Sequence, residues 1–314
     1  MRLLTYQDDS GVHVGALRGD PATTLDAVAS APGAPAGKGT FEQRGEVVAL
    51  DSVARNMLEL IDGGARLLEQ ARAALERADT VRDLRDVRLL APIPRPRQNV
   101  ICLGMNYVEH AHESARARGR DPKVPAHPVF FTKAVTSVCG PYDDIPLDSR
   151  VTAQLDYEVE LAFVIGRGGK NIERSDALNH IFGYTIVNDI SARDLQSQHM
   201  QFFKGKSLDS SCPMGPWIVT ADELPDPAAL GLRLRLNGET RQESAVGNLI
   251  FDIPTIIATL ALGQTLEPGV IVSTGTPSGV GLGRNPPEYM RPGDLIESEV
   301  DRIGMLRNRV VAAE

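Results

Sequence analysis

The chain has 314 residues, of which 42% are hydrophobic and 24% are charged, a balance typical of a folded globular protein with one large domain or two smaller ones. The formal net charge is −8 and the arginines are not grouped with aromatic residues, which argues against nucleic acid as a partner. Charged residues near the start and the lack of an apolar run of roughly 20 residues favour a cytoplasmic protein without a membrane span.

The first 90 residues contain no chemical motif. A short strand-like start and a loop rich in glycine, alanine and proline at 31–39 precede apolar residues at helical spacing from about Ser52 to Asp79. The prolines of residues 91–97 then forbid helix and favour an extended connector. We therefore predict a small N-terminal α/β domain at residues 1–90 and a larger domain at residues 91–314.

The larger domain is predicted to be rich in strands. Short apolar runs are separated by glycine, proline and aspartate, and they predict strands at residues 99–103, 129–131, 155–165, 182–187, 217–220, 232–236, 270–273 and 295–300. These runs do not alternate with long helices, as a doubly wound fold requires. The pattern predicts an α+β fold built on a strongly coiled mixed sheet.

A histidine and a glutamate share one face of a predicted helix at residues 106–113, because His110 and Glu113 are three residues apart. A carboxylate beside an imidazole raises its basicity and fixes its orientation, so the pair could activate water as a general base. The alternative is a weak pair on a helix surface, and His112 is a weaker candidate. The arginines at 116, 118 and 120, which follow this helix, could bind a second substrate carboxylate or form a solvated face.

Two carboxylates lie two residues apart in the apolar run at 155–166. Side chains alternate along a strand, so Glu158 and Glu160 would share a face, where burial without a counter-ion is costly. Asp189 ends the next buried run. Three carboxylates with water are typical of Mg²⁺ or Mn²⁺ sites that keep positions open for substrate. The alternative is a solvated strand face, with Asp189 capping the next helix.

Cations and an amide follow the third carboxylate. Arg193, Gln196 and Lys206 suit an α-keto acid that chelates the metal while Lys206 stabilises an oxyanion or enolate. Ordinary surface salt bridges are the alternative. The glycine-rich segment 273–283 could let a ligand approach backbone N–H groups, or it could be a mobile surface loop.

Six blocks of sequence occur in an order that resembles the fumarylacetoacetate hydrolase family over roughly residues 90 to 310: Asn106–Glu113, Pro128–Lys133, Asp156–Leu161, Asn188–Gln196, Gly205–Asp209 and Thr274–Gly281. The resemblance implies a homodimer whose catalytic domain is a coiled β-roll. It implies a Mg²⁺ or Mn²⁺ ion on Glu158, Glu160 and Asp189, and a lid helix that carries His110 and Glu113. It also implies Lys206 as oxyanion stabiliser, and the predicted substrate-binding residues are Lys133, Arg193, Gln196 and Thr276.

The His-x-x-Glu pattern is similar to that of acylpyruvate hydrolases and related decarboxylases. We therefore predict metal-dependent hydrolysis of a C–C bond in an acylpyruvate such as fumarylpyruvate, which yields pyruvate and a carboxylic acid. The alternative is a decarboxylase or isomerase that acts on 2-oxo or 2-hydroxydienoic dicarboxylates of the homoprotocatechuate type, or on oxaloacetate. A non-catalytic, metal-stabilised binding protein is the alternative from another class.

Overall fold

The computed structural model describes residues 1–19, 45–119 and 121–313. The loop expected at 31–39 and Arg120 of the arginine cluster lie outside the described residues. Among the described helices, none has both the length and the apolar character that a membrane span requires.

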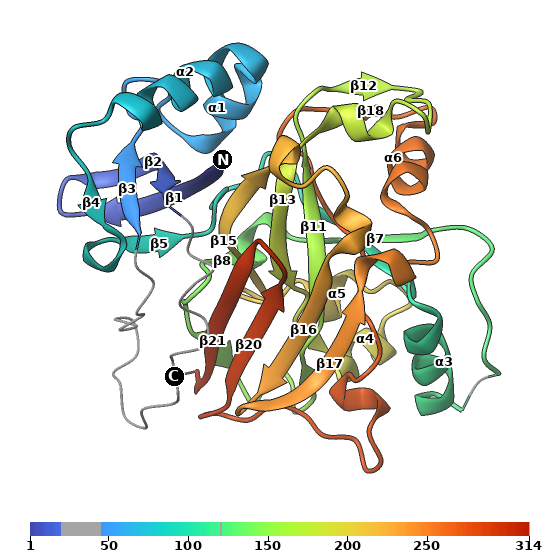
Figure 1. Ribbon diagram of the computed structural model, residues 1–314. Coiled ribbons are helices and arrows are strands. Elements are labelled where there is room, and N and C mark those ends of the chain that lie inside the picture. Colours follow the sequence, from blue (N-terminus) through green and yellow to red (C-terminus); the bar gives the residue numbers. More distant parts are fainter. Residues whose placement is uncertain (20–44, 120, 314) are drawn as a thin grey trace.

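The larger of two main sheets holds the centre of the molecule (Figure 1). In the described residues it has twelve strands, in the order β4 (Arg82–Asp83), β3 (Glu46–Ala49), β2 (Gly11–Arg18), β1 (Arg2–Asp8), β15 (Cys212–Thr220), β13 (Ile181–Asn188), β11 (Val159–Ile165), β19 (Ile271–Ser273), β6 (Val100–Gly104) and β7 (Val129–Lys133), with β5 (Arg88–Leu90) on β1 and β8 (Val138–Cys139) on β15. The pairs β19–β6 and β15–β8 are parallel and the other pairs are antiparallel. The sheet is therefore mixed.

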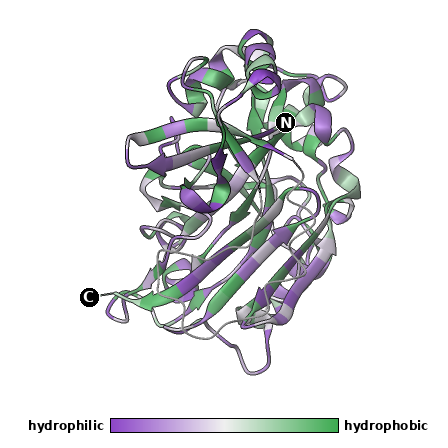
Figure 2. Ribbon diagram, turned by 60° about the vertical axis from the view of Figure 1, so that its left-hand side comes forward, coloured by the Kyte–Doolittle hydropathy of each residue, from purple (hydrophilic) through white to green (hydrophobic). Residues whose placement is uncertain are grey.

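A second sheet has five strands, in the order β17 (Glu239–Ala245), β16 (Gly231–Leu236), β20 (Leu295–Val300), β21 (Gly304–Ala312) and β9 (Ile145–Leu147). Buried and partly exposed residues alternate along β16 and β20, and Figure 2 shows the matching alternation of hydrophobic and hydrophilic residues. One face of this sheet is therefore buried and the other faces solvent. Two further short pairs lie in the described part of the chain: β10 (Leu155–Asp156) with β14 (Ser191–Ala192), and β12 (Gly169–Lys170) with β18 (Thr265–Leu266).

The helices of the described residues are few and short, which together with the mixed sheets confirms the predicted α+β class. They are α1 (Met57–Asp62), α2 (Gly64–Arg77), α3 (Val108–Ala117), α4 (Arg193–Gln198), α5 (Phe203–Lys206) and α6 (Ile253–Ala261). The helix predicted at 106–113 is α3, and it ends later than expected, so Arg116 lies within it and Arg118 caps it.

Strand β11 divides the core into two layers. Leu161 and Phe163 belong to one apolar cluster, whereas Ala162 and Val164 belong to the other. Because side chains alternate across a strand, both faces of β11 are covered, and all seven of its residues are buried. The carboxylates at the start of β11 therefore lie in the interior of the protein rather than on a solvated face.

The N-terminal elements are joined to the larger sheet instead of standing apart. Strand β1 pairs with β15 through Arg2 and Leu3, and Figure 1 shows these first strands beside β15. Met1, Leu3 and Val14 share an apolar cluster with Val164 and Ile218. The division at residues 1–90 and 91–314 stays a proposal, and the two parts share a sheet and a core.

The helix predicted from Ser52 to Asp79 is two helices. The helical conformation is interrupted at Gly63 and Gly64. Gly64 has a φ of +54°, a left-handed conformation that ends a right-handed helix. The prediction missed the break because the apolar spacing continues across it. The predicted strands of the larger domain also did not include β17 and β21.

Two glycine-to-alanine variants should separate backbone strain from crowding. In Gly183→Ala, the new Cβ would lie 2.3 Å from the carbonyl oxygen of Val219 in the neighbouring strand, so β13 must shift. We expect a loss of about 3 kcal/mol in the free energy of unfolding. Gly64→Ala meets no atom within 4 Å and should cost about 1 kcal/mol, through its left-handed backbone alone. Urea unfolding followed by circular dichroism measures both, and equal losses would contradict this account.

Candidate active site

Three buried carboxylates converge at one end of the central strands. Glu158 directly precedes β11, Glu160 is its second residue, and Asp189 directly follows β13. Val159 is opposite Asn188 in the antiparallel register, and the N–H of Asp189 donates to the carbonyl of Glu158 at 2.8 Å. The register therefore joins the start of β11 to the end of β13, and one oxygen from each carboxylate lies within 4.8 Å of the others.

Three cations surround these carboxylates. Lys206 Nζ lies 2.7 Å from both Glu158 Oε2 and Asp189 Oδ2, and Arg193 Nη2 lies 2.6 Å from Glu158 Oε1. Lys133 Nζ lies 2.7 Å from Asp189 Oδ1. All three cationic side chains are at least 96% buried, so each charge needs its partner.

The two glutamates have opposite electrostatic environments. Burial opposes ionisation of Glu158, but Lys206 and Arg193 outweigh it and hold the pKa of Glu158 well below its usual range. Burial, Asp189 and Glu158 together raise the pKa of Glu160 well above its usual range. For Lys206, burial opposes the charged form, yet Asp189 and Glu158 raise its pKa, so the ammonium stays charged. Glu160 is thus the carboxylate that the protein cations stabilise least.

The two oxygens of Glu160 differ in their hydrogen-bond partners. Its Oε2 accepts hydrogen bonds from Ser273 Oγ at 2.5 Å and from the N–H of Gly275 at 2.9 Å. Its Oε1 is buried and has no hydrogen-bond partner among the described residues. A buried acceptor without a donor is costly, whereas a hard divalent cation binds such an oxygen. The donor set of carboxylate oxygens therefore fits Mg²⁺ or Mn²⁺.

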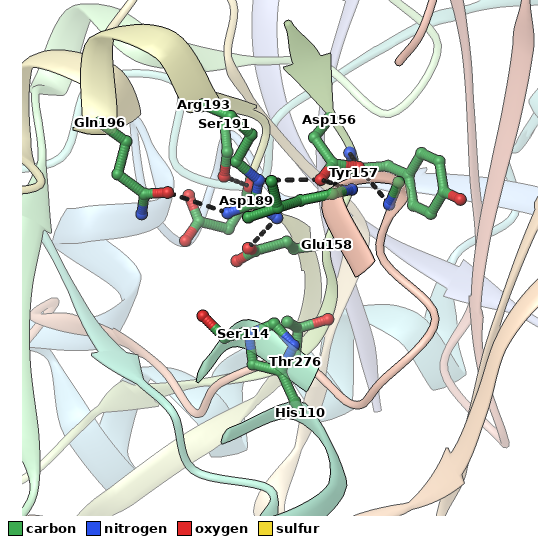
Figure 3. A network of polar contacts seen from close by, with 12 residues as sticks. His110, Ser114, Asp156, Tyr157, Glu158, Asp189, Ser191, Arg193, Gln196 and Thr276 are labelled. Carbon is green, nitrogen blue, oxygen red and sulfur yellow. Dashed lines mark hydrogen bonds and ion pairs between the residues drawn. The ribbon is translucent and has the colours of Figure 1, made fainter. Parts of the chain in front are cut away.

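A cavity of about 40 Å³ lies next to Glu158. The predicted site residues that line it are His110, Glu158, Arg193, Gln196, Lys206 and Thr276. Figure 3 shows Glu158, Arg193 and Gln196 on one side and His110 and Thr276 on the other. Leu103, Phe131 and Phe202 supply apolar lining. The structure thus brings the predicted general base, the cations of Arg193 and Lys206 and one of the predicted metal ligands to the same cavity.

Helix α3 covers this cavity with the predicted His–Glu pair. His110 Nδ1 lies 3.3 Å from Glu113 Oε2, and His110 is 7% exposed. Asn106 fixes the start of the helix, because its buried amide donates to the carbonyl of Thr274 at 2.8 Å and accepts from the N–H of Phe251 at 2.8 Å. The helix is thereby tied to the loop that follows β19.

Lys133, predicted to bind substrate, contacts Asp189 and does not line the cavity. It is fully buried, and its Nζ donates to Asp189 Oδ1 and to the carbonyl of Ile190 at 3.0 Å. It is not among the described residues that line the cavity. This position favours a role in holding Asp189 over direct contact with substrate, because both hydrogen bonds go to protein acceptors and the side chain does not line the cavity.

Gln196 and Thr276 line the cavity but already have protein partners. Gln196 Oε1 accepts from Arg193 Nη1 at 3.2 Å and from Arg118 Nη2 at 3.1 Å. Thr276 Oγ1 donates to the carbonyl of Val159 at 3.0 Å. Their contact with substrate stays a prediction.

Two buried residues of the site were not singled out from the sequence. Asp156 accepts from Arg193 Nε at 2.8 Å and from the N–H groups of Gly281 at 2.7 Å and Leu282 at 3.0 Å. Its position two residues before Glu158 continues the Glu-x-Glu alternation, and this signal could have found it. Gln242 comes from β17; its Oε1 accepts from the N–H of Val159 and its Nε2 donates to Thr276 Oγ1. No sequence pattern indicated it.

The protein thus has an α+β fold in which three buried carboxylates lie near a His–Glu pair, an arrangement typical of an enzyme active site. Residues 99–311 match the family model described as the C-terminal domain of fumarylacetoacetate hydrolase. The chain belongs to the fumarylacetoacetate hydrolase family, and it is an enzyme of that family.

Named relatives show several activities. The chain is 46% identical to oxaloacetate tautomerase YisK of Bacillus subtilis over 83% of this chain and 88% of the relative. The structure of the fumarylacetoacetate hydrolase of Exiguobacterium antarcticum has a TM-score of 0.79 and 36% identity, and covers both chains fully. The maleylpyruvate hydrolase of Sphingobium sp. SYK-6, solved with manganese(II) and pyruvate, has a TM-score of 0.73 and 28% identity, with both chains fully covered.

Replacing Glu160 should weaken metal binding. Glu160→Gln keeps the size of the side chain and an acceptor for Ser273, but removes the charge that the ion would neutralise. We expect Mn²⁺ affinity to fall by more than about 100-fold, because replacing even a residue that only orients a metal ligand costs up to that amount. Isothermal titration calorimetry measures it, with Glu109→Gln on the exposed side of α3 as control. Equal affinity in the two variants would show that the ion binds elsewhere.

Proposed function

We propose that this enzyme interconverts the keto and enol forms of oxaloacetate or a closely related 2-oxo dicarboxylate, with Mg²⁺ or Mn²⁺ held by Glu158, Glu160 and Asp189. The observation that carries the proposal is the meeting of charged Lys206 and Arg193 with the His110–Glu113 pair around one cavity. The identity to the oxaloacetate tautomerase of Bacillus subtilis supports the choice of substrate.

The reaction requires proton transfer at carbon 3 and stabilisation of negative charge on the 2-oxo oxygen. Glu113 holds His110 through Nδ1, which leaves Nε2 to take the proton from carbon 3 and to return it in the reverse direction. Lys206 remains an ammonium, so it serves as a hydrogen-bond donor to the enolate oxygen instead of a base. The enol forms when that oxygen takes a proton from water, and His110 returns its own proton to water. When bound, the divalent ion would polarise the 2-oxo group.

The electrostatics suit a substrate with two carboxylates. Four buried carboxylates, including Asp156, face three buried cations, so the protein cluster has one net negative charge when all are ionised. A divalent ion would reverse the sign to one positive charge. The cluster that includes Arg193 then has a net positive charge, and it attracts a dianion more strongly than a neutral carbonyl compound.

Hydrolysis of an acylpyruvate such as fumarylpyruvate is the second candidate. Like the first reaction it forms the enolate of a 2-oxo acid, here the enolate of pyruvate as leaving group, and the similarity to a maleylpyruvate hydrolase solved with pyruvate favours it. His110 with Glu113 would then deprotonate water in place of carbon 3. Decarboxylation of oxaloacetate also passes through the enolate, whereas a purely structural metal site would have no need of the His–Glu pair. Homodimer formation and cytoplasmic location stay predictions.

An assay that follows the tautomers and the cleavage products separately tests the proposal. Purified protein with Mg²⁺ or Mn²⁺ should accelerate loss of the enol absorbance of oxaloacetate, while pyruvate and CO₂ stay at the level of the protein-free control. Release of pyruvate from fumarylpyruvate without acceleration of tautomerisation would instead establish the hydrolase. Rapid CO₂ release from oxaloacetate would establish the decarboxylase.

A histidine pair on α3 provides a matched test of the base. His110→Asn should lower kcat/KM for tautomerisation by about 10²- to 10⁴-fold, the usual contribution of general acid–base catalysis. His112→Asn, on the same helix but outside the cavity lining, should leave it unchanged. Mn²⁺ affinity should be the same in both variants. Comparable losses of kcat/KM in the two variants would remove His110 from the mechanism.

A further inference from the structure

The residue between the two glutamates of the site lies beyond the end of a neighbouring strand. Strand β19 pairs with β11 from Ala162 to Val164, so Val159 has no partner in β19. Two side chains take the place of the strand there. The N–H of Val159 donates to Gln242 Oε1 at 3.0 Å, and its carbonyl accepts from Thr276 Oγ1 at 3.0 Å. Gln242 and Thr276 therefore hold the main chain between two of the predicted metal ligands.

The amide of Gln242, which is 1% exposed, has one orientation that satisfies its neighbours. The N–H of Val159 is a donor, so it faces the amide oxygen. The carbonyl of Pro277 is an acceptor, so the amide atom 2.8 Å from it is Nε2, which also donates to Thr276 Oγ1 at 2.8 Å. A flipped amide would place its oxygen against the carbonyl oxygen of Pro277 and its NH₂ group against the N–H of Val159.

This orientation fixes the polarity of the Thr276 hydroxyl. A hydroxyl has one hydrogen and two lone pairs. One lone pair of Thr276 Oγ1 accepts from Gln242 Nε2, and the hydrogen goes to the carbonyl of Val159. To donate elsewhere, the hydroxyl would have to leave the buried Val159 carbonyl without this donor, which is costly. The remaining lone pair means that Thr276 accepts from a further group and does not donate to it.

A ligand that contacts Thr276 Oγ1 must therefore bring a donor. Thr276 lines the cavity together with Arg193 and Lys206, whose cationic groups are donors. The keto form of a 2-oxo dicarboxylate dianion has only acceptors, in its carboxylates and its 2-oxo group. The enol form has in addition one O–H at carbon 2. The two cations thus suit both tautomers, whereas the uncharged acceptor on Thr276 suits the enol.

We propose that Gln242 fixes the Thr276 hydroxyl as an acceptor, and that this hydroxyl receives the O–H of the enol form of the substrate. Gln242 is a positioning residue, because it acts on the substrate through Thr276. Thr276 contacts the substrate, as the sequence predicts, and it favours one tautomer instead of binding a carboxylate. Lys206 donates to the enol oxygen from which Thr276 accepts. The choice of an enol as the ligand rests on the proposed function.

Two dianions that do not react distinguish an acceptor from a donor at Thr276. Malate has a hydroxyl at carbon 2, as the enol has, and succinate has the same two carboxylates without it. Isothermal titration calorimetry with saturating Mg²⁺ measures both dissociation constants. In Thr276→Val, that of malate should rise about tenfold, which corresponds to one neutral hydrogen bond, and that of succinate should change by less than about twofold. Thr276→Ser, which restores the hydroxyl, should bind malate as the wild type does.

Gln242→Met tests the positioning, because it keeps a side chain of similar size and removes the donor to Thr276. The dissociation constant of malate should rise about three- to tenfold, with succinate unchanged. In the Thr276→Val background the same methionine should leave the ratio of the two dissociation constants unchanged, because there is no hydroxyl left to orient. Gln264→Met, at an exposed position, is the control. Circular dichroism checks that each variant is folded.

Three results would overturn the proposal. Equal weakening of malate and succinate in Thr276→Val would show that the hydroxyl binds a carboxylate. Unchanged malate affinity would show that it does not contact the ligand, and losses that multiply in the double variant would show that Gln242 acts independently. These binding results stand even if the enzyme proves to be a hydrolase. During tautomerisation, Thr276→Val should raise KM for the enol form of oxaloacetate about tenfold and leave KM for the keto form unchanged.

Discussion

The structure of the site depends on the repulsion among Glu158, Glu160 and Asp189, which are buried within 4.8 Å of one another. Lys206 and Arg193 neutralise Glu158, and Lys133 with Lys206 neutralises Asp189, so the conflict is concentrated on Glu160. Its raised pKa and its unpartnered Oε1 are two expressions of the same deficit of positive charge. A divalent ion would remove this deficit and displace any proton held there.

The sheet produces this arrangement through register alone. Pairing of β11 with β13 places Glu158 beside Asp189, and pairing of β11 with β19 aligns Glu160 with the N–H of Gly275. A one-residue slip of β11 would turn both glutamates to the other face, into an apolar cluster. The central strands are covered on both faces, which makes that alternative costly and keeps the carboxylates together.

Much of this site could be predicted because its signals are local. The two-residue spacing of Glu158 and Glu160 and the three-residue spacing of His110 and Glu113 are direct consequences of strand and helix periods. The position of Lys133 could not be predicted, because the contact between the end of β7 and Asp189 arises from tertiary packing. Gln242 was missed for the same reason, as it comes from another sheet. The break at Gly64 depends on one backbone angle that apolar spacing does not record.

The most direct test of the account is the position of a bound ion. A crystal soaked in Mn²⁺ and examined by anomalous scattering should show one strong peak at roughly 2.0–2.2 Å from oxygens of Glu158, Glu160 and Asp189, in the range usual for hard divalent ions. A fully occupied Mn²⁺ site elsewhere in the protein, with Glu160 Oε1 still without a ligand, would contradict it.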